Sequence, residues 1–94
     1  MKENLLEALY QAFLSLETEE ECKAFLSDLC TKNELISMSQ RLESAKMLLA
    51  GKTYSEVTEA TDISSATLAK VSKCIRYGGG GYERIIRKNG AEEC

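Results

Sequence analysis

Apolar residues recur at helical spacing along most of the chain. In residues 3–16 they fall mostly three and four positions apart, at Leu5, Leu6, Leu9, Ala12, Phe13 and Leu16. This spacing predicts an amphipathic helix. Because a chain of 94 residues has a limited core of its own, a second subunit is one place where so apolar a face can be buried.

Two further helices are expected to begin with a Thr-x-x-Glu pattern, which is typical of a capping box. Thr18 and Glu21 open the second helix, and Thr31 and Glu34 open the third. The second helix carries one apolar stripe, made of Cys22, Phe25, Leu26, Leu29 and Cys30. We expect both of its cysteines to lie in the core.

The third helix is expected to run to about Ala50, with Gly51 as its stop. Apolar residues step along it by three and four positions, at Leu35, Met38, Leu42, Ala45 and Leu49. This a/d seam suits lengthwise packing against other helices.

Residues 53–76, TYSEVTEATDISSATLAKVSKCIR, predict two short helices joined by a tight turn. Thr53 and Glu56 form another expected capping box. Asp62 is expected in the turn, because Asp tolerates a left-handed backbone better than most residues do. Ile63 would fill the gap between the helices, whose inward residues are expected to be Val57, Ala60, Leu68, Val71 and Ile75.

The second of these helices has a polar and basic face. Either Ser64 or Ser65 can cap its start, and its outer face carries Ser65, Ala66, Lys70, Lys73 and Arg76. A capped helix with small residues at its start and basic residues along one side suits the major groove of DNA.

After this pair of helices comes YGGGGY at residues 77–82. Four glycines permit a sharp reversal with positive φ, and the flanking tyrosines favour an ordered turn over a flexible linker. A last helix over residues 83–88 would turn Ile85 and Ile86 inward and its basic residues outward. Residues 91–94 are expected to fray.

Charge is unevenly divided along the chain. Residues 1–63 carry six Lys/Arg and twelve Asp/Glu, a net charge of −6, whereas residues 64–94 carry six Lys/Arg and three Glu, a net charge of +3. Because the local field matters more for phosphate binding than total charge does, the overall −3 is compatible with DNA binding.

Composition argues against catalysis, metal binding and membrane insertion. The chain has no His, and its four cysteines form no CxxC pair, so neither a triad nor a common zinc site is expected. The glycine run lacks the pattern of a phosphate-binding loop. With neither a signal peptide nor a long apolar run, we expect a cytoplasmic protein with reduced thiols that is not an enzyme.

The order of elements resembles the Trp repressor superfamily, and most closely its YerC/YecD-type subgroup. The resemblance covers roughly residues 5–88. It is carried by the segment LYQAFLSLETEEECKAFLSDLCTKNELISMSQRLESAKMLLAGKTYSEV, by the helix-turn-helix, and by the tail KCIRYGGGGYERIIRK. The resemblance implies an all-α fold of five to six helices that forms an intertwined homodimer. Residues 1–94 would be one domain, with a dimer core at about 3–50 and 82–90 and a reading head at about 53–77.

In the Trp repressor, L-tryptophan binds between the core and the reading head. The matching positions here are Thr31, Arg41, Thr67, Lys70, Val71 and Cys74. Lys70 replaces a stacking arginine, Val71 a glycine beside the ligand, and Cys74 a hydrogen-bonding serine. We therefore predict that tryptophan is not the corepressor. Binding of an unidentified small-molecule effector is still open. No cofactor and no metal are expected.

These observations predict a sequence-specific transcriptional regulator, acting as a repressor, whose partners are double-stranded DNA and a second copy of itself. The expected DNA-binding residues are Ser55, Ser64, Ser65, Ala66, Thr67, Lys70, Lys73 and Arg76. A helical protein-interaction adaptor is the alternative, since many helix-turn-helix folds bind proteins. Salt-sensitive DNA affinity would separate the two.

Overall fold

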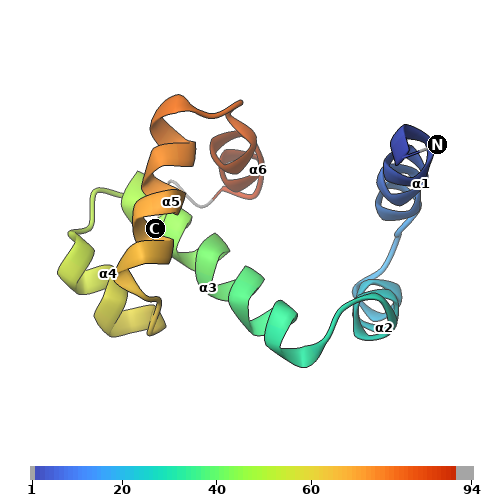
Figure 1. Cartoon of the computed structure of the whole chain (residues 1–94), viewed down its shortest axis with the longest axis horizontal. Helices are drawn as coiled ribbons and strands as arrows, with labels where there is room; N and C mark the ends of the chain where they lie inside the picture. The colour runs from blue at the N-terminus through green and yellow to red at the C-terminus, as the bar shows by residue number, and fades with distance from the viewer. Residues whose placement is uncertain (1, 91–94) are drawn as a thin grey trace. The chain divides into compact units, whose positions relative to one another are not determined.

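The computed structural model describes residues 2–90, with side chains from residue 4 onward. Within that range the chain forms helices and no strand, as predicted (Figure 1). The helices are α1 (Lys2–Leu14), α2 (Glu19–Leu29), α3 (Lys32–Leu49), α4 (Tyr54–Thr61), α5 (Ser65–Tyr77) and α6 (Gly81–Lys88). The chain divides into two compact units, one up to Lys32 and one from Asn33 onward. The predicted division into a dimer core and a reading head stays a prediction.

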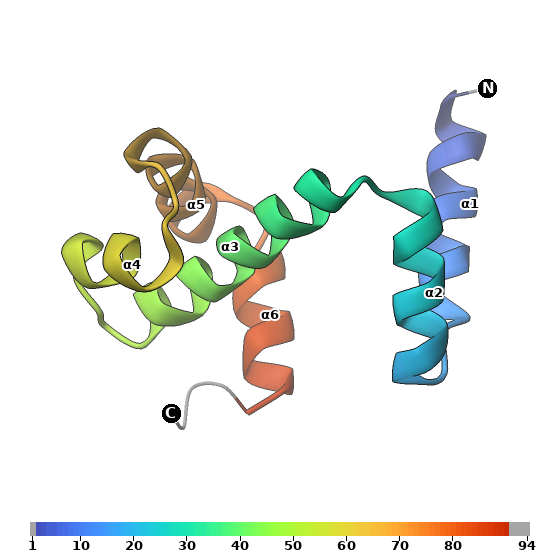
Figure 2. The ribbon, with the colours of Figure 1, turned by 90° about the horizontal axis from the view of Figure 1, so that it is seen from below.

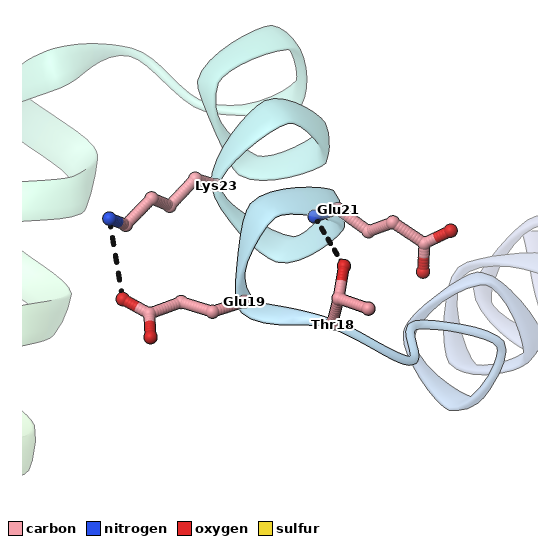
Figure 3. A network of polar contacts seen from close by, with 4 residues as sticks. All are labelled: Thr18, Glu19, Glu21 and Lys23. Atoms are coloured by element: carbon pink, nitrogen blue, oxygen red, sulfur yellow. Dashed lines mark hydrogen bonds and ion pairs between the residues drawn. The ribbon is translucent and has the colours of Figure 1, made fainter.

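The start of α2 follows the predicted capping pattern with one difference (Figure 3). The Thr18 hydroxyl accepts a hydrogen bond from the backbone N–H of Glu21 at 3.1 Å. The Glu21 carboxylate, however, accepts from the N–H of Glu17 at 2.9 Å, one residue before the expected partner. Glu19 and Lys23 form an exposed ion pair at 3.3 Å, which contributes little stability because water screens it.

The first unit buries few of its apolar residues. Phe13 of α1 and Phe25 of α2 meet edge to face, with ring centroids 5.7 Å apart. Among the described side chains up to Lys32, none is fully buried. Cys22 and Cys30 are half-buried and do not form the expected closed core, because no further element of this unit covers their stripe.

The end of α3 has the hydrogen bonds of a Schellman motif. The Lys52 N–H donates to the Met47 carbonyl at 3.0 Å and the Gly51 N–H to the Leu48 carbonyl at 3.0 Å. Gly51 has φ 89°, which confirms its predicted role as the stop, and α3 ends at Leu49, one residue early. Along the predicted seam Ala45 is fully buried, whereas Leu42 is 49% exposed.

The core of the second unit lies where α4, α5 and α6 gather around the C-terminal half of α3 (Figures 1 and 2). It consists of Ala45, Val57, Ile63, Leu68, Val71 and Ile86. Two expectations were wrong: Ala60 is exposed and Ile85 is 50% exposed. Both lie on apolar faces of short helices, but the other elements of the unit leave Ala60 exposed and cover Ile85 only in part.

The glycine run forms an ordered turn that differs from the expected one. Only Gly80 among the four has a positive φ, 83°, and α6 begins within the run at Gly81. Tyr82 packs against the core, but Tyr77 is 77% exposed and does not pack as expected. Aromatic packing therefore holds one side of the turn only.

Gly78 and Gly79 provide a matched pair of substitutions in this turn. A Cβ at Gly78 would collide with the backbone carbonyl oxygen of Cys74, whereas a Cβ at Gly79 would meet nothing. Gly78→Ala should therefore lower the free energy of unfolding by about 1–3 kcal/mol, the usual range for overpacking. Gly79→Ala should change it little. Urea unfolding measures both, and equal effects would contradict this packing.

Candidate nucleic-acid interface

The first helix of the helix-turn-helix, α4, begins with the predicted capping box. The Thr53 hydroxyl accepts from the N–H of Glu56 at 3.1 Å, and the Glu56 carboxylate accepts from the N–H of Thr53 at 2.8 Å. Two hydrogen bonds to the Glu56 carboxylate lower the pKa of Glu56. The larger effect comes from the Thr53 backbone N–H and the smaller from the Thr53 hydroxyl. This closed pair defines where α4 starts and leaves neighbouring Ser55 exposed.

The turn between α4 and α5 uses a left-handed residue, as predicted. Asp62 has φ 62° and is the one non-glycine residue with positive φ in the described chain. Its N–H donates to the Thr58 carbonyl at 2.9 Å. Ile63 follows and is only 5% exposed, which confirms that it fills the gap between the helices.

The start of α5 settles which serine is the cap. The Ser64 hydroxyl accepts from the N–H of Thr67 at 3.2 Å and lies 2.9 Å from the Thr67 hydroxyl, to which it donates. Ser64 and Thr67 are therefore tied to each other. Ser65 and Ala66 are exposed at the N-terminal end of the helix.

Three basic residues follow on α5. Lys70 and Lys73 are exposed and form no ion pair within the described residues. The Arg76 guanidinium donates to the Ser72 hydroxyl at 3.2 Å and lies 5.9 Å from the centre of the Tyr77 ring. Since no Asp or Glu occurs between residues 63 and 82, no acidic residue of this stretch offsets their charge.

The residues of the predicted effector pocket differ in exposure and belong to different parts of the chain. Lys70 and Cys74 border one open apolar groove together with Tyr77 and Gly78. Val71 lies beneath the surface at 2% exposure, whereas Arg41 is exposed on α3. Thr67 belongs to the cap of α5, and Thr31 belongs to the other unit.

Sequence reasoning missed a polar contact between α3 and the end of α4. The side-chain amide of Gln40 donates to the Thr61 carbonyl at 3.0 Å, and the hydroxyls of Ser44 and Thr61 are 3.4 Å apart. Gln40 and Ser44 are four residues apart and so share one face of α3. This spacing could have indicated a polar contact surface on α3. No residue near Gln40 or Ser44 in the sequence indicates that Thr61 is their partner.

These helices define an all-α protein with a capped helix-turn-helix. The chain belongs to the Trp repressor family: residues 4–90 match the family described as Trp repressor protein. It is 46% identical over 81 residues to YerC of Bacillus subtilis (strain 168), which is described as uncharacterized. The matched residues cover 86% of this chain and 78% of that protein. The predicted family resemblance is thereby confirmed.

Two solved structures share the fold. A candidate Trp repressor from Staphylococcus aureus superposes with a TM-score of 0.92 at 39% identity, over 95% of this chain and 89% of that one. A TrpR like protein from Eubacterium eligens ATCC 27750 gives a TM-score of 0.89 at 42% identity, over 93% and 90% of the two chains.

Within the described residues, no helix is both long and apolar enough to cross a membrane.

The capping box makes the stability of α4 depend on pH. Because the folded-state pKa of Glu56 is lowered, its contribution is present above the unfolded-state pKa and is lost as the pH falls through the folded-state value. In the Glu56→Gln variant the glutamine side chain can still form the capping box, but it has no carboxyl group to titrate. The difference in unfolding free energy between parent and variant, measured by urea unfolding, should be constant near neutrality and shrink at acidic pH. A difference that does not vary with pH would contradict this account.

Proposed function

We propose that the protein is a sequence-specific DNA-binding transcriptional regulator that acts as a homodimeric repressor. The observation that carries this proposal is the exposed outer face of α5, a helix whose start is capped by Ser64. No acidic residue occurs in the surrounding stretch, residues 63–82. Lys70 and Lys73 give this face its positive charge, which matches the phosphate backbone. Membership of a family of regulators supports the same reading and gives no reason to propose catalysis.

The proposed contacts divide into base readout and backbone positioning. Ser65, Ala66 and Thr67 would meet base edges, with the Thr67 hydroxyl held by Ser64. The long basic side chains would contact phosphate or guanine, and these are Lys70, Lys73 and Arg76. Ser55, exposed at the start of α4, would donate a hydrogen bond to phosphate.

A second copy of the chain is the proposed cover for the apolar residues that one chain leaves exposed. Leu5 is 69% exposed, Leu14 76% and Leu42 49%. Isolated apolar side chains on a surface are ordinary, but helix faces this apolar favour burial in an interface. Two reading heads in one dimer would enter successive major grooves of a pseudo-palindromic site, about 34 Å apart.

We also propose that DNA binding does not depend on tryptophan. Lys70 lacks the planar group that stacks on an indole. The Val71 side chain occupies the place of a glycine, and Cys74 is a weak hydrogen-bond donor where a serine would serve. A different small-molecule effector is compatible with this proposal.

Lys73→Ala tests the assignment of the basic face. Each phosphate contact contributes about 0.9 to the slope of log affinity against log salt, so losing one contact in each half-site should flatten the slope by roughly 2. Fluorescence anisotropy with a labelled duplex at several salt concentrations measures the slope. Thr67→Val should instead change sequence preference.

Lys23→Ala is the matched control, because it removes the same charge from α2, where Lys23 pairs with Glu19. Its slope should equal that of the parent. If Lys73→Ala and Thr67→Val both bind like the parent, α5 does not present this face to DNA.

Selection of bound fragments from a random DNA pool tests the function itself. We expect a palindromic motif to be enriched equally with and without L-tryptophan. Enrichment only with tryptophan would overturn the interpretation of Lys70, Val71 and Cys74. Enrichment of no motif under either condition would contradict specific DNA binding and favour the adaptor alternative.

A further inference from the structure

A group of polar side chains joins α3 to the helix-turn-helix at the end of α4. We infer that Gln40, Ser44 and Thr61 form a latch that sets the orientation of the reading helices, and that Thr61 is a positioning residue for DNA recognition. We call this group the Thr61 latch. The inference rests on the proposed function and concerns how that function is achieved.

The Thr61 hydroxyl takes part in three contacts at once. It donates to the Val57 carbonyl at 2.8 Å and accepts from the N–H of Ile63 at 3.2 Å. Since a hydroxyl has one proton and two acceptor sites, the Ser44 hydroxyl must be the donor in the 3.4 Å contact. The Thr61 hydroxyl therefore has its full complement of partners.

The backbone of Thr61 is held from α3 as well. Thr61 is the last residue of α4, and the last carbonyls of a helix have no partner within the helix. The Gln40 amide donates to the Thr61 carbonyl at 3.0 Å. One turn of α3 thus supplies a partner for the end of α4, while the Thr61 hydroxyl binds the N–H of Ile63 in the turn itself.

The apolar core alone defines the orientation of α4 weakly. Val57 is the one buried residue of this eight-residue helix. Burial of apolar surface is non-directional, so one buried side chain permits small rotations of the helix. Hydrogen bonds are directional, and those of the Thr61 latch meet where α4 ends and the turn to α5 begins.

The consequence concerns sequence-specific binding in particular. Base-edge contacts require the start of α5 to be placed accurately, whereas phosphate contacts through long basic side chains tolerate small displacements. Weakening the latch should therefore reduce affinity for the selected site and leave affinity for random duplexes unchanged.

Thr61→Val tests the latch, because it removes the hydroxyl with little change of shape. We expect affinity for the selected site to fall roughly tenfold, with unchanged affinity and salt slope on random DNA. Thr61→Ser retains the hydroxyl and should restore binding. Gln40→Met removes the second arm without altering α4, so it keeps the test usable if Thr61→Val folds poorly.

Thr58→Val is the matched control. Thr58 lies on the same helix, and its hydroxyl donates to the Ser55 carbonyl at 3.0 Å, within α4. Thr58→Val should bind like the parent. Equal losses in Thr58→Val and Thr61→Val, or a Thr61→Val variant with parental specific affinity, would overturn the inference.

Hydrogen exchange in the absence of DNA separates the latch from the proposed function. Thr61→Val should expose the Ile63 N–H and the first turn of α5 to faster exchange, while Thr61→Ser and Thr58→Val should not. If the parent selects no DNA motif, the proposed function fails and this exchange pattern alone decides whether the latch holds the reading helices. Identical exchange in Thr61→Val and parent would contradict the latch.

Discussion

Burial of one small apolar cluster is the interaction on which the second unit depends. Ala45 of α3, Val57 of α4 and Val71 of α5 are at most 2% exposed, so burial of these side chains joins three helices of the unit. Because Ala45 has a small side chain, neighbouring helices can approach α3 closely at that point. Of the two helices of the helix-turn-helix, α5 buries Leu68, Val71 and Ser72, whereas α4 buries Val57 alone. The inferred role of polar contacts in orientation therefore concerns α4.

Local signals in the sequence predicted the helix starts well. Thr18, Thr53 and Ser64 act through bonds to residues three positions ahead, so their effect depends on little beyond the neighbouring backbone. The same holds for Asp62, whose conformation follows from its side chain and its place between two helices. The family, the all-α fold and the helix-turn-helix could all be recognised from such patterns.

Features that depend on distant segments could not be predicted in the same way. Periodicity shows that Ala60 and Ile85 lie on apolar faces, but it does not show whether another helix extends far enough to cover them. Gln40 and Thr61 are 21 positions apart, and their contact exists only after α4 has docked. The predicted DNA contacts and effector pocket stay predictions for a related reason, since they concern partners outside the chain.

The division of charge has a consequence for how the protein would approach DNA. Residues 1–63 carry a net −6 and residues 64–94 a net +3. Electrostatic fields reach about 30 Å at 0.01 M salt but about 8 Å at 0.15 M. If the protein binds DNA through α5 as proposed, the acidic part of the chain would repel DNA at very low salt, and moderate salt would screen this repulsion while close contacts persist. The rate of association should pass through a maximum at intermediate ionic strength, instead of falling steadily as it does for uniformly basic proteins.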